Sequence, residues 1–261
     1  MTIHAIEEIK DAAADSRPVL AIRLGRGRTG GSTFLDFLVQ RTRRKGKTIR
    51  VADGDRNHAT LSEWYPPGES GGALRPRGAE IGDVAEWVMD VVSQMALDQV
   101  SLVLDMGASD TALEEVAKQM SLCEFCEASG IALLAIYSLG PTKDDFNDAM
   151  TIYEKGYARC ERTLFVMNES LVENGKGVAG AFDFVMEDER YEAIKRDVRS
   201  VMMPKLGCMK AMRDEKLSAY EAADGDRGVS GRPMSLAHQY VVKSWINRME
   251  ARLSLVQDWL P

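Results

Sequence analysis

Short apolar runs alternate with longer amphipathic segments along most of the chain. The apolar runs of strand length are residues 18–24, 48–52, 100–104, 131–137 and 163–167. Such alternation is typical of βαβ units, in which helices join parallel strands. The run at 131–137 is apolar throughout, which predicts a strand buried on both faces of a sheet. We therefore expect an α/β fold, with a doubly wound, mostly parallel sheet flanked by helices.

Helical periodicity marks most of the remaining chain. Apolar residues three and four positions apart predict helices at 31–45, 80–97, 110–128, 142–158, 189–222 and 234–258. Alternating side chains at 182–186 predict a short last strand, and the Pro- and Gly-rich residues 66–78 predict a mobile surface loop. Because no repeat or low-complexity tract separates two parts, we expect a single domain over residues 1–261.

The last predicted helix, within residues 234–261, has one apolar face. Its members recur at helical spacing and are Tyr240, Trp245, Ile246, Met249, Leu253, Val256 and Leu260. We expect this face to pack on the body of the domain, with dimer contact and membrane association as the competing interpretations. The polar face mixes acidic and basic residues, whereas a membrane-binding helix favours a basic one.

Composition excludes several classes of protein. Apolar residues make up 45% and charged residues 28% of the chain, which is the balance of a globular protein. A net charge of -7 argues against a surface that is basic throughout, although a local basic patch that binds DNA stays open. Four scattered cysteines, charged residues at 1–10 and the lack of a long apolar stretch predict a cytoplasmic protein without a signal peptide or transmembrane segment.

A glycine-rich loop between the first predicted strand and helix is the strongest indication of function. Residues 24–33 read Leu-Gly-Arg-Gly-Arg-Thr-Gly-Gly-Ser-Thr. Glycines at such a junction let backbone N–H groups surround phosphates, and a following Ser or Thr can bind Mg²⁺. Gly31 stands where a phosphate-binding loop ordinarily has its lysine. The loop therefore predicts nucleotide binding, but it does not by itself predict hydrolysis.

Polar residues follow three further predicted strands, at positions that a parallel sheet brings to one edge. Asp53 and Asp55 follow the second strand, Asp105 follows the third, and Asn168 follows a later one. A carboxylate opposite the glycine loop suits Mg²⁺, and Asp105 fits that role. The alternative is that these residues form turns and helix caps, as Asp and Asn commonly do after strands.

These motifs resemble the ParA/MinD group of deviant Walker A ATPases. That family has a KGGxGK[ST]T loop, a second strand ending in DxD with Asn-Ala-Thr soon after, a third strand ending in Asp, and an Asn after a later strand. In the same order, this chain has RGRTGGST at 26–33, DGDRNHAT at 53–60, LVLDMG at 102–107 and VMNES at 166–170. The resemblance implies an ATP- and Mg²⁺-dependent homodimeric switch with a protein partner in plasmid partition or conjugative transfer. We expect its ATP hydrolysis to be slow or stimulated by a partner, because Gly31 replaces the lysine. Because some members of the family bind DNA non-specifically, the resemblance also makes such DNA binding an expectation here.

The functional positions of the family carry over residue by residue. The resemblance implies that Arg26 replaces the signature lysine that reaches the nucleotide of the other subunit, and that Asp55 or Asp53 orients the attacking water. It implies Mg²⁺ binding by Ser32 and Asp105, with Thr33 at the α-phosphate and Asn168 at the adenine. The full set implied to bind the nucleotide is Gly27, Arg28, Thr29, Gly30, Gly31, Ser32, Thr33 and Asn168. We expect Arg28 to supply the charge that Gly31 lacks.

Two other functions stay open. A non-hydrolysing adaptor would keep the fold while its loop decayed, and Gly31 favours this alternative. A dinucleotide-dependent enzyme is compatible with the spacing of Gly25, Gly27 and Gly30, which fits G-x-G-x-x-G. Against it, Asp53 lies somewhat far from this motif for the acidic residue that binds a ribose.

Three smaller patterns have ordinary interpretations. The basic residues 41–47 could contact DNA, but cations before Gly46 are typical of a helix C-terminus. Cys123 and Cys126 have CxxC spacing but lack the second pair of ligands that a structural zinc needs. His58 could face a γ-phosphate, although a solvated loop is the simpler interpretation.

Overall fold

A computed structural model of the protein describes residues 17–107, 111–173 and 177–261. Within these ranges, six strands form one sheet in the order β2-β3-β1-β4-β5-β6, and each neighbouring pair is parallel. The strands are β1 (Val19–Leu24), β2 (Ile49–Asp53), β3 (Ser101–Asp105), β4 (Ala132–Leu139), β5 (Arg162–Asn168) and β6 (Val198–Met203). The doubly wound α/β fold is thus confirmed, with the first five strands within two residues of their predicted ends.

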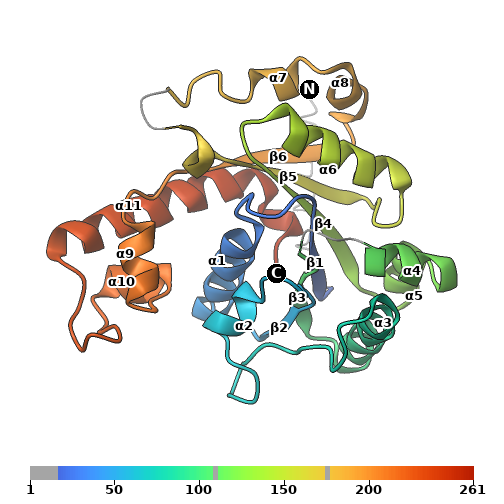
Figure 1. The fold of residues 1–261 in the computed structure, drawn as a ribbon, viewed down its shortest axis with the longest axis horizontal. Coiled ribbons are helices and arrows are strands. Elements are labelled where there is room, and N and C mark those ends of the chain that lie inside the picture. Colours follow the sequence, from blue (N-terminus) through green and yellow to red (C-terminus); the bar gives the residue numbers. More distant parts are fainter. Residues whose placement is uncertain (1–16, 108–110, 174–176) are drawn as a thin grey trace, which may run out of the picture.

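Helices cover both faces of the sheet (Figure 1). One face carries α1 (Gly31–Arg44), α2 (Thr60–Trp64), α9 (Met209–Asp214), α10 (Ala219–Asp224), α11 (Leu236–Leu253) and the 3-10 helix η2 (Ser254–Trp259). The other carries α3 (Ile81–Asp98), α4 (Thr111–Gln119), α5 (Leu122–Ala128), α6 (Lys143–Lys155), α7 (Asp183–Met186) and α8 (Glu189–Ile194). A 3-10 turn, η1 (Glu169–Leu171), follows β5.

Each face of the sheet has its own hydrophobic core. Along β1, Leu20 and Ile22 enter one core while Val19 and Ala21 enter the other. This alternation explains why the run of apolar residues is unbroken, since both sides of a central parallel strand are covered. Because β1 lies between β3 and β4, the loop that follows it emerges at the middle of the sheet. In open α/β sheets, ligands bind at this position.

In two segments the sequence predicts the wrong kind of secondary structure. Residues 182–186 do not form a strand. Residues 183–186 form α7 after its N-cap Phe182, because Phe182 and Val185, three positions apart, both enter the core. The last strand is instead β6, which lies inside the segment predicted as helix at 189–222. Pairing of β6 with β5, including Val201 opposite Val166, outweighs the helical propensity of the residues around it.

Two predicted helices are also divided. The segment predicted as one helix at 110–128 forms α4 and α5, because the Ser121 hydroxyl accepts a hydrogen bond from the Glu124 amide and begins a new helix. Residue 110 itself lies outside the described ranges. The C-terminal segment leaves α-helical geometry after Leu253 and continues as η2.

Helix α11 lies against α1 through the apolar face predicted from its spacing. Trp245 is 2% exposed, meets Phe37 edge to face with ring centroids 5.3 Å apart, and donates from its indole Nε1 to the Pro204 carbonyl at 2.7 Å. Ile246, Met249, Leu253, Val256 and Leu260 are buried as well. Tyr240 was predicted on this face but is 76% exposed, because five positions from Trp245 turn it well away from the buried side.

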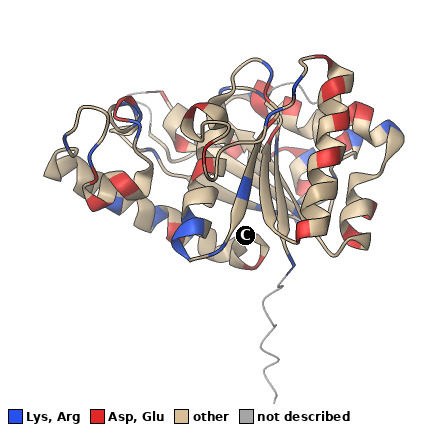
Figure 2. Ribbon diagram, turned by 90° about the horizontal axis from the view of Figure 1, so that it is seen from below, with Lys and Arg blue, Asp and Glu red and all other residues tan. Residues whose placement is uncertain are grey.

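The basic residues among 41–47 mainly form ion pairs and the cap at the C-terminal end of α1. Arg41 is buried and its Nε lies 2.9 Å from both carboxylate oxygens of Glu250, while Arg44 pairs with Asp224 at 2.6 Å. Gly46 has a φ of 74°, as expected just after a helix C-terminus. These contacts favour the helix-end interpretation over DNA binding here. Figure 2 shows basic and acidic residues interspersed over the elements visible from below.

The described helices contain no segment long and apolar enough to cross a membrane. The charged residues 1–10, on which the prediction of no signal peptide rests, lie outside the described ranges.

Candidate functional site

The loop between β1 and α1 turns sharply over the end of the sheet. Gly25, Arg28 and Gly30 have φ values of 96°, 65° and 88°. Glycine adopts this conformation readily, whereas Arg28 does so at a cost. No described side chain caps the first turn of α1, and this turn has no acidic residue. Its backbone amides and the positive end of the helix dipole are therefore available to an anion.

Gly30 is needed for space as well as for its backbone conformation. A Cβ at this position would lie 2.2 Å from Nδ2 of Asn168. Asn168 is buried at the end of β5, where its Nδ2 donates to the Thr29 carbonyl at 3.0 Å and its Oδ1 accepts from the Ser170 amide at 2.9 Å. Both ends of this amide are engaged, so Asn168 holds the glycine loop in place from β5.

Ser32 and Asp105 meet beneath the loop. The Ser32 hydroxyl donates to Oδ2 of Asp105 at 2.5 Å. Asp105 is 1% exposed at the end of β3, and its Oδ1 accepts from the Gly107 amide at 3.0 Å. A hydroxyl beside a carboxylate provides the oxygen ligands that Mg²⁺ prefers, next to amides that suit phosphate. The residues present therefore fit a Mg²⁺-nucleotide.

Asp53, the last residue of β2, and Asp55, two positions later, have different surroundings. Oδ1 of Asp55 accepts from the amides of Asn57 and His58, at 2.8 and 2.9 Å. Asp53 is fully buried, and its Oδ2 accepts from both the amide and the hydroxyl of Ser62 at 2.8 Å. Burial raises the pKa of Asp53, and the two Ser62 donors oppose this shift. Asp53 thus ties α2 to the sheet.

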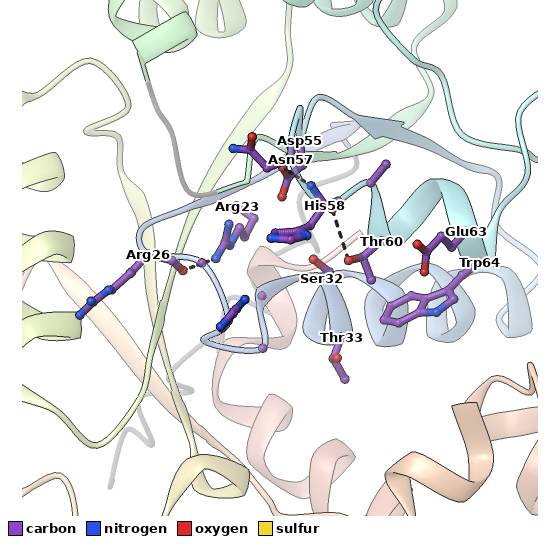
Figure 3. Close-up of a pocket in the computed structure, with 15 residues that line it drawn as sticks. Arg23, Arg26, Ser32, Thr33, Asp55, Asn57, His58, Thr60, Glu63 and Trp64 are labelled. Atoms are coloured by element: carbon purple, nitrogen blue, oxygen red, sulfur yellow. Dashed lines mark hydrogen bonds between the residues drawn. The ribbon is translucent and has the colours of Figure 1, made fainter. Parts of the chain in front are cut away.

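A cleft of about 1170 Å³ brings most of these groups together (Figure 3). Residues of the β1–α1 loop form one wall, and residues 55–64 form the other. The volume is sufficient for a nucleoside triphosphate, since pockets for small ligands span roughly 300–1,000 Å³. Among the predicted site residues, those that line the cleft are Arg26, Gly27, Arg28, Gly30, Gly31, Ser32, Thr33 and Asp55. Thr29, Asp53, Asp105 and Asn168 are buried behind its wall.

The side chain of Arg26 points away from the other labelled side chains of the cleft (Figure 3). Its guanidinium lies 3.7 to 3.8 Å from the carboxylates of Asp144, Asp145 and Asp148 at the start of α6. Arg26 is about half exposed, so these ion pairs are weak. In this arrangement Arg26 does not serve the phosphate position of its own loop.

Arg23 also belongs to the site, although the sequence analysis did not single it out. The unpredicted residues that line the cleft beside it are Asn57, Ala59, Thr60, Glu63 and Trp64. Arg23 belongs to β1, is 3% exposed and lines the cleft. Its Nη2 donates to the Arg26 carbonyl and, at 3.3 Å, to the Thr29 hydroxyl, and its Nη1 lies 3.7 Å from Oδ1 of Asp105. The available sequence signal was a single arginine within the apolar run at 18–24, immediately before the glycine loop.

Cys123 and Cys126 lie on α5, where they line a cavity of about 170 Å³ together with Cys160. None of these three thiols is part of a disulfide bond. Within the described ranges, no group of three or more His, Cys, Asp or Glu residues is arranged to hold a metal ion.

We expect the native thiols of α5 to react slowly with iodoacetamide. Burial raises the pKa of Cys123 to about 11 and that of Cys126 to about 12, from the ordinary thiol value of 9.0. Because the thiolate is the nucleophile, at pH 8 the reactive fraction falls about a hundredfold for Cys123 and about a thousandfold for Cys126. Alkylation followed by mass spectrometry, with the urea-unfolded protein as reference, measures this protection. Equal rates in the native and unfolded proteins would contradict it.

Comparisons with known proteins reach only the level of the fold. No family model and no curated protein match the chain. Similar solved structures include the signal recognition particle receptor FtsY from Elizabethkingia anophelis in complex with GDP, at 15% identity, covering 71% of this chain and 57% of that chain, with a TM-score of 0.46. Another is chloroplast FtsY from Physcomitrella patens, at 15% identity, covering 88% and 65% of the two chains, with a TM-score of 0.49.

A third is the cell division protein ftsY from Thermotoga maritima, at 15% identity, covering 88% of this chain and 68% of that chain, with a TM-score of 0.45. This chain thus spans less than two thirds of the first two proteins. Such a likeness concerns the α/β fold and does not extend to membership of the ParA/MinD family or to a biological role.

Proposed function

We propose that this chain is a nucleotide-binding switch protein of the ParA/MinD kind that binds ATP together with Mg²⁺ and hydrolyses it slowly. The observation that carries the proposal is the 2.5 Å contact between Ser32 and Asp105 beneath the uncapped start of α1. It joins the end of β3 to the first turn of α1, beside backbone amides suited to phosphate. When bound, Mg²⁺ would neutralise charge on the phosphates.

The other residues have separate roles in this proposal. Backbone amides of residues 27–33 surround the phosphates, and the Thr33 hydroxyl contacts the α-phosphate. Asp55 is better placed than Asp53 to orient an attacking water, because Asp55 lines the cleft. Contact of Asn168 with the adenine would require it to exchange its bond to Thr29.

We further propose that two copies close on the nucleotide, with Arg26 reaching the neighbouring subunit. Its exposed ion pairs with α6 cost little to exchange, so the side chain can turn outward. Sedimentation velocity with and without ATP tests this step. A protein partner in plasmid partition or conjugative transfer, non-specific DNA contact and a cytoplasmic location are the setting that the resemblance supports.

A non-hydrolysing adaptor is the second candidate, and the glycine at position 31 favours it. Phosphoryl transfer depends on placed positive charge, and loss of one such group costs about 10³ to 10⁵ in rate. A phosphate-release assay distinguishes the two functions. Turnover at background level, despite nucleotide binding, would identify the adaptor.

Nucleotide binding itself is tested by thermal denaturation and calorimetry with ATP and GTP, each with Mg²⁺. Ligand at a hundred times its Kd stabilises the fold by about 2.7 kcal/mol, which raises the Tm of a chain this long by roughly 5–10 °C. Gly30→Ala should abolish this rise, because its Cβ would meet Asn168. Gly46→Ala is the matched control, since Gly46 also has positive φ but no neighbour within 4 Å. No uptake of either nucleotide by the unaltered chain would refute the proposal.

A further inference from the structure

We propose that Arg23 supplies, from strand β1, the positive charge that a phosphate-binding loop ordinarily takes from a lysine at the position of Gly31. This inference rests on the proposed nucleotide binding. It assigns the charge to a residue outside the loop, whereas the sequence pattern directs attention to the arginines within it.

The position of Arg23 is unusual for a structural arginine. It is 3% exposed on the central strand, and burial of a charge is costly unless every polar group finds a partner. Its Nε is buried, and no described residue accepts a hydrogen bond from it. Arg23 nevertheless lines the cleft. The guanidinium therefore has donor capacity left over at the place where the glycine loop would hold an anion.

Arg23 and a side chain at position 31 exclude each other. A Cβ built on Gly31 would lie 2.3, 2.7 and 2.9 Å from Nε, Cγ and Cδ of Arg23. Contacts under 3.0 Å with the stem of a buried side chain require that side chain to move. Gly31 is thus the residue that leaves room for Arg23, and the missing lysine does not show that the loop has decayed.

The contacts of the guanidinium place it on the inner side of the loop. Its Nη2 donates to the carbonyl of Arg26 and the hydroxyl of Thr29, both of which belong to the loop, while Nη1 faces Asp105 at 3.7 Å. The cation therefore lies between the loop and the carboxylate assigned to Mg²⁺. The paired N–H donors of arginine match the spacing of phosphate oxygens. When a nucleotide binds, its phosphate oxygens can replace the Arg26 carbonyl and the Thr29 hydroxyl as acceptors.

The other arginines of the loop are less well placed. The side chain of Arg26 extends toward the carboxylates of α6, whereas Arg23 lies on the side of the loop that faces Asp55 and His58 (Figure 3). Arg28 lines the cleft from the loop itself, with a φ of 65°. Arg23 combines burial, fixed geometry and proximity to Asp105, so we assign it to the β- and γ-phosphates.

Calorimetric titration with ATP, ADP and AMP in the presence of Mg²⁺ tests this assignment. Arg23→Gln removes the charge and keeps donors, and it should weaken ATP and ADP binding about ten- to hundredfold, as expected for a hydrogen bond to a charged group. AMP binding should change by less than about threefold, since AMP lacks the β- and γ-phosphates. The double variant Arg23→Ala, Gly31→Lys should bind ATP with most of the affinity of the unaltered chain. Its lysine supplies a positive charge in the space that the arginine side chain occupied.

Gly31→Ala gives an independent measurement that keeps Arg23 in the chain. It should weaken ATP as Arg23→Gln does, because the new Cβ displaces the arginine, whereas Gly46→Ala should have no effect. An equal loss for ATP, ADP and AMP, or full ATP affinity in either Gly31→Ala or Arg23→Gln, would overturn the role of Arg23 alone. An unaltered chain that binds none of the three nucleotides would overturn the proposed function and this inference together.

Discussion

Replacing Asp105 with asparagine is expected to abolish most of the gain in nucleotide affinity that Mg²⁺ provides. The carboxylate is buried, accepts from the Ser32 hydroxyl at 2.5 Å and lies beside the start of α1. Asparagine keeps the shape but loses the negative charge, and a hard cation binds carboxylate much more strongly than a neutral amide. The ratio of the Kd without Mg²⁺ to the Kd with it should fall from about tenfold or more to near one, a change of about 1.4 kcal/mol or more.

The ratio is informative because it separates metal binding from general damage to the loop. Without metal, the asparagine variant should bind ATP at least as well as the unaltered chain, since a negative charge near the phosphates has been removed. Asp98→Asn is the control, because Asp98 is a surface carboxylate of α3 that pairs with Arg50, away from the cleft. An asparagine variant that retains the full Mg²⁺ ratio would remove Asp105 from the metal site.

Replacing Trp245 with alanine is expected to lower the free energy of unfolding by about 3–5 kcal/mol. The indole is among the largest fully enclosed side chains of the chain, packs edge to face on Phe37 and donates to the Pro204 carbonyl. Alanine would leave a cavity between α1 and α11 and a buried carbonyl without its donor. Urea unfolding followed by circular dichroism measures the loss. If the C-terminal helix were only loosely attached, the free energy of unfolding would change far less.

Tyr240→Ala provides the comparison within the same helix. Tyr240 is an aromatic residue five positions earlier, but it is 76% exposed, so its replacement should change the free energy of unfolding by no more than about 0.5 kcal/mol. A similar loss for both variants would show that the burial of Trp245 against α1 is not what distinguishes it in stabilising this region, since alanine itself favours the helix.

The sequence predicts the central strands well because strands that are buried on both faces appear as unbroken apolar runs. In β1 and β4 almost every side chain is apolar, since both sides of the sheet are covered. The edge strand β6 lacks this signal. Arg199 is partly exposed and lies 4.1 Å from the centroid of the Trp259 ring, and β6 pairs with a strand on one side only. Its identity as a strand depends on β5 and on a distant C-terminal segment, neither of which is visible in local periodicity.

The parts of the site that follow directly from strand ends were also predictable. Asp53 lies opposite Asp105 in the sheet, and Arg23 also lies opposite Asp105 on the other side, so the register alone gathers these charges. The separate roles of Asp53 and Asp55 were not predictable, because they depend on which carboxylate Ser62 reaches. Arg23 was missed because loop motifs count positions along the chain, whereas its side chain approaches the loop from the strand below.

The steric exclusion between Arg23 and position 31 limits which pairs of residues these two positions can hold together. A single replacement at either position leaves the loop with a displaced arginine or with no cation from either source. A lysine side chain at position 31 therefore requires a smaller residue at position 23 in the same chain. Arginine at position 23 and glycine at position 31 are thus sterically coupled, so that a change at one position alters what the other can hold.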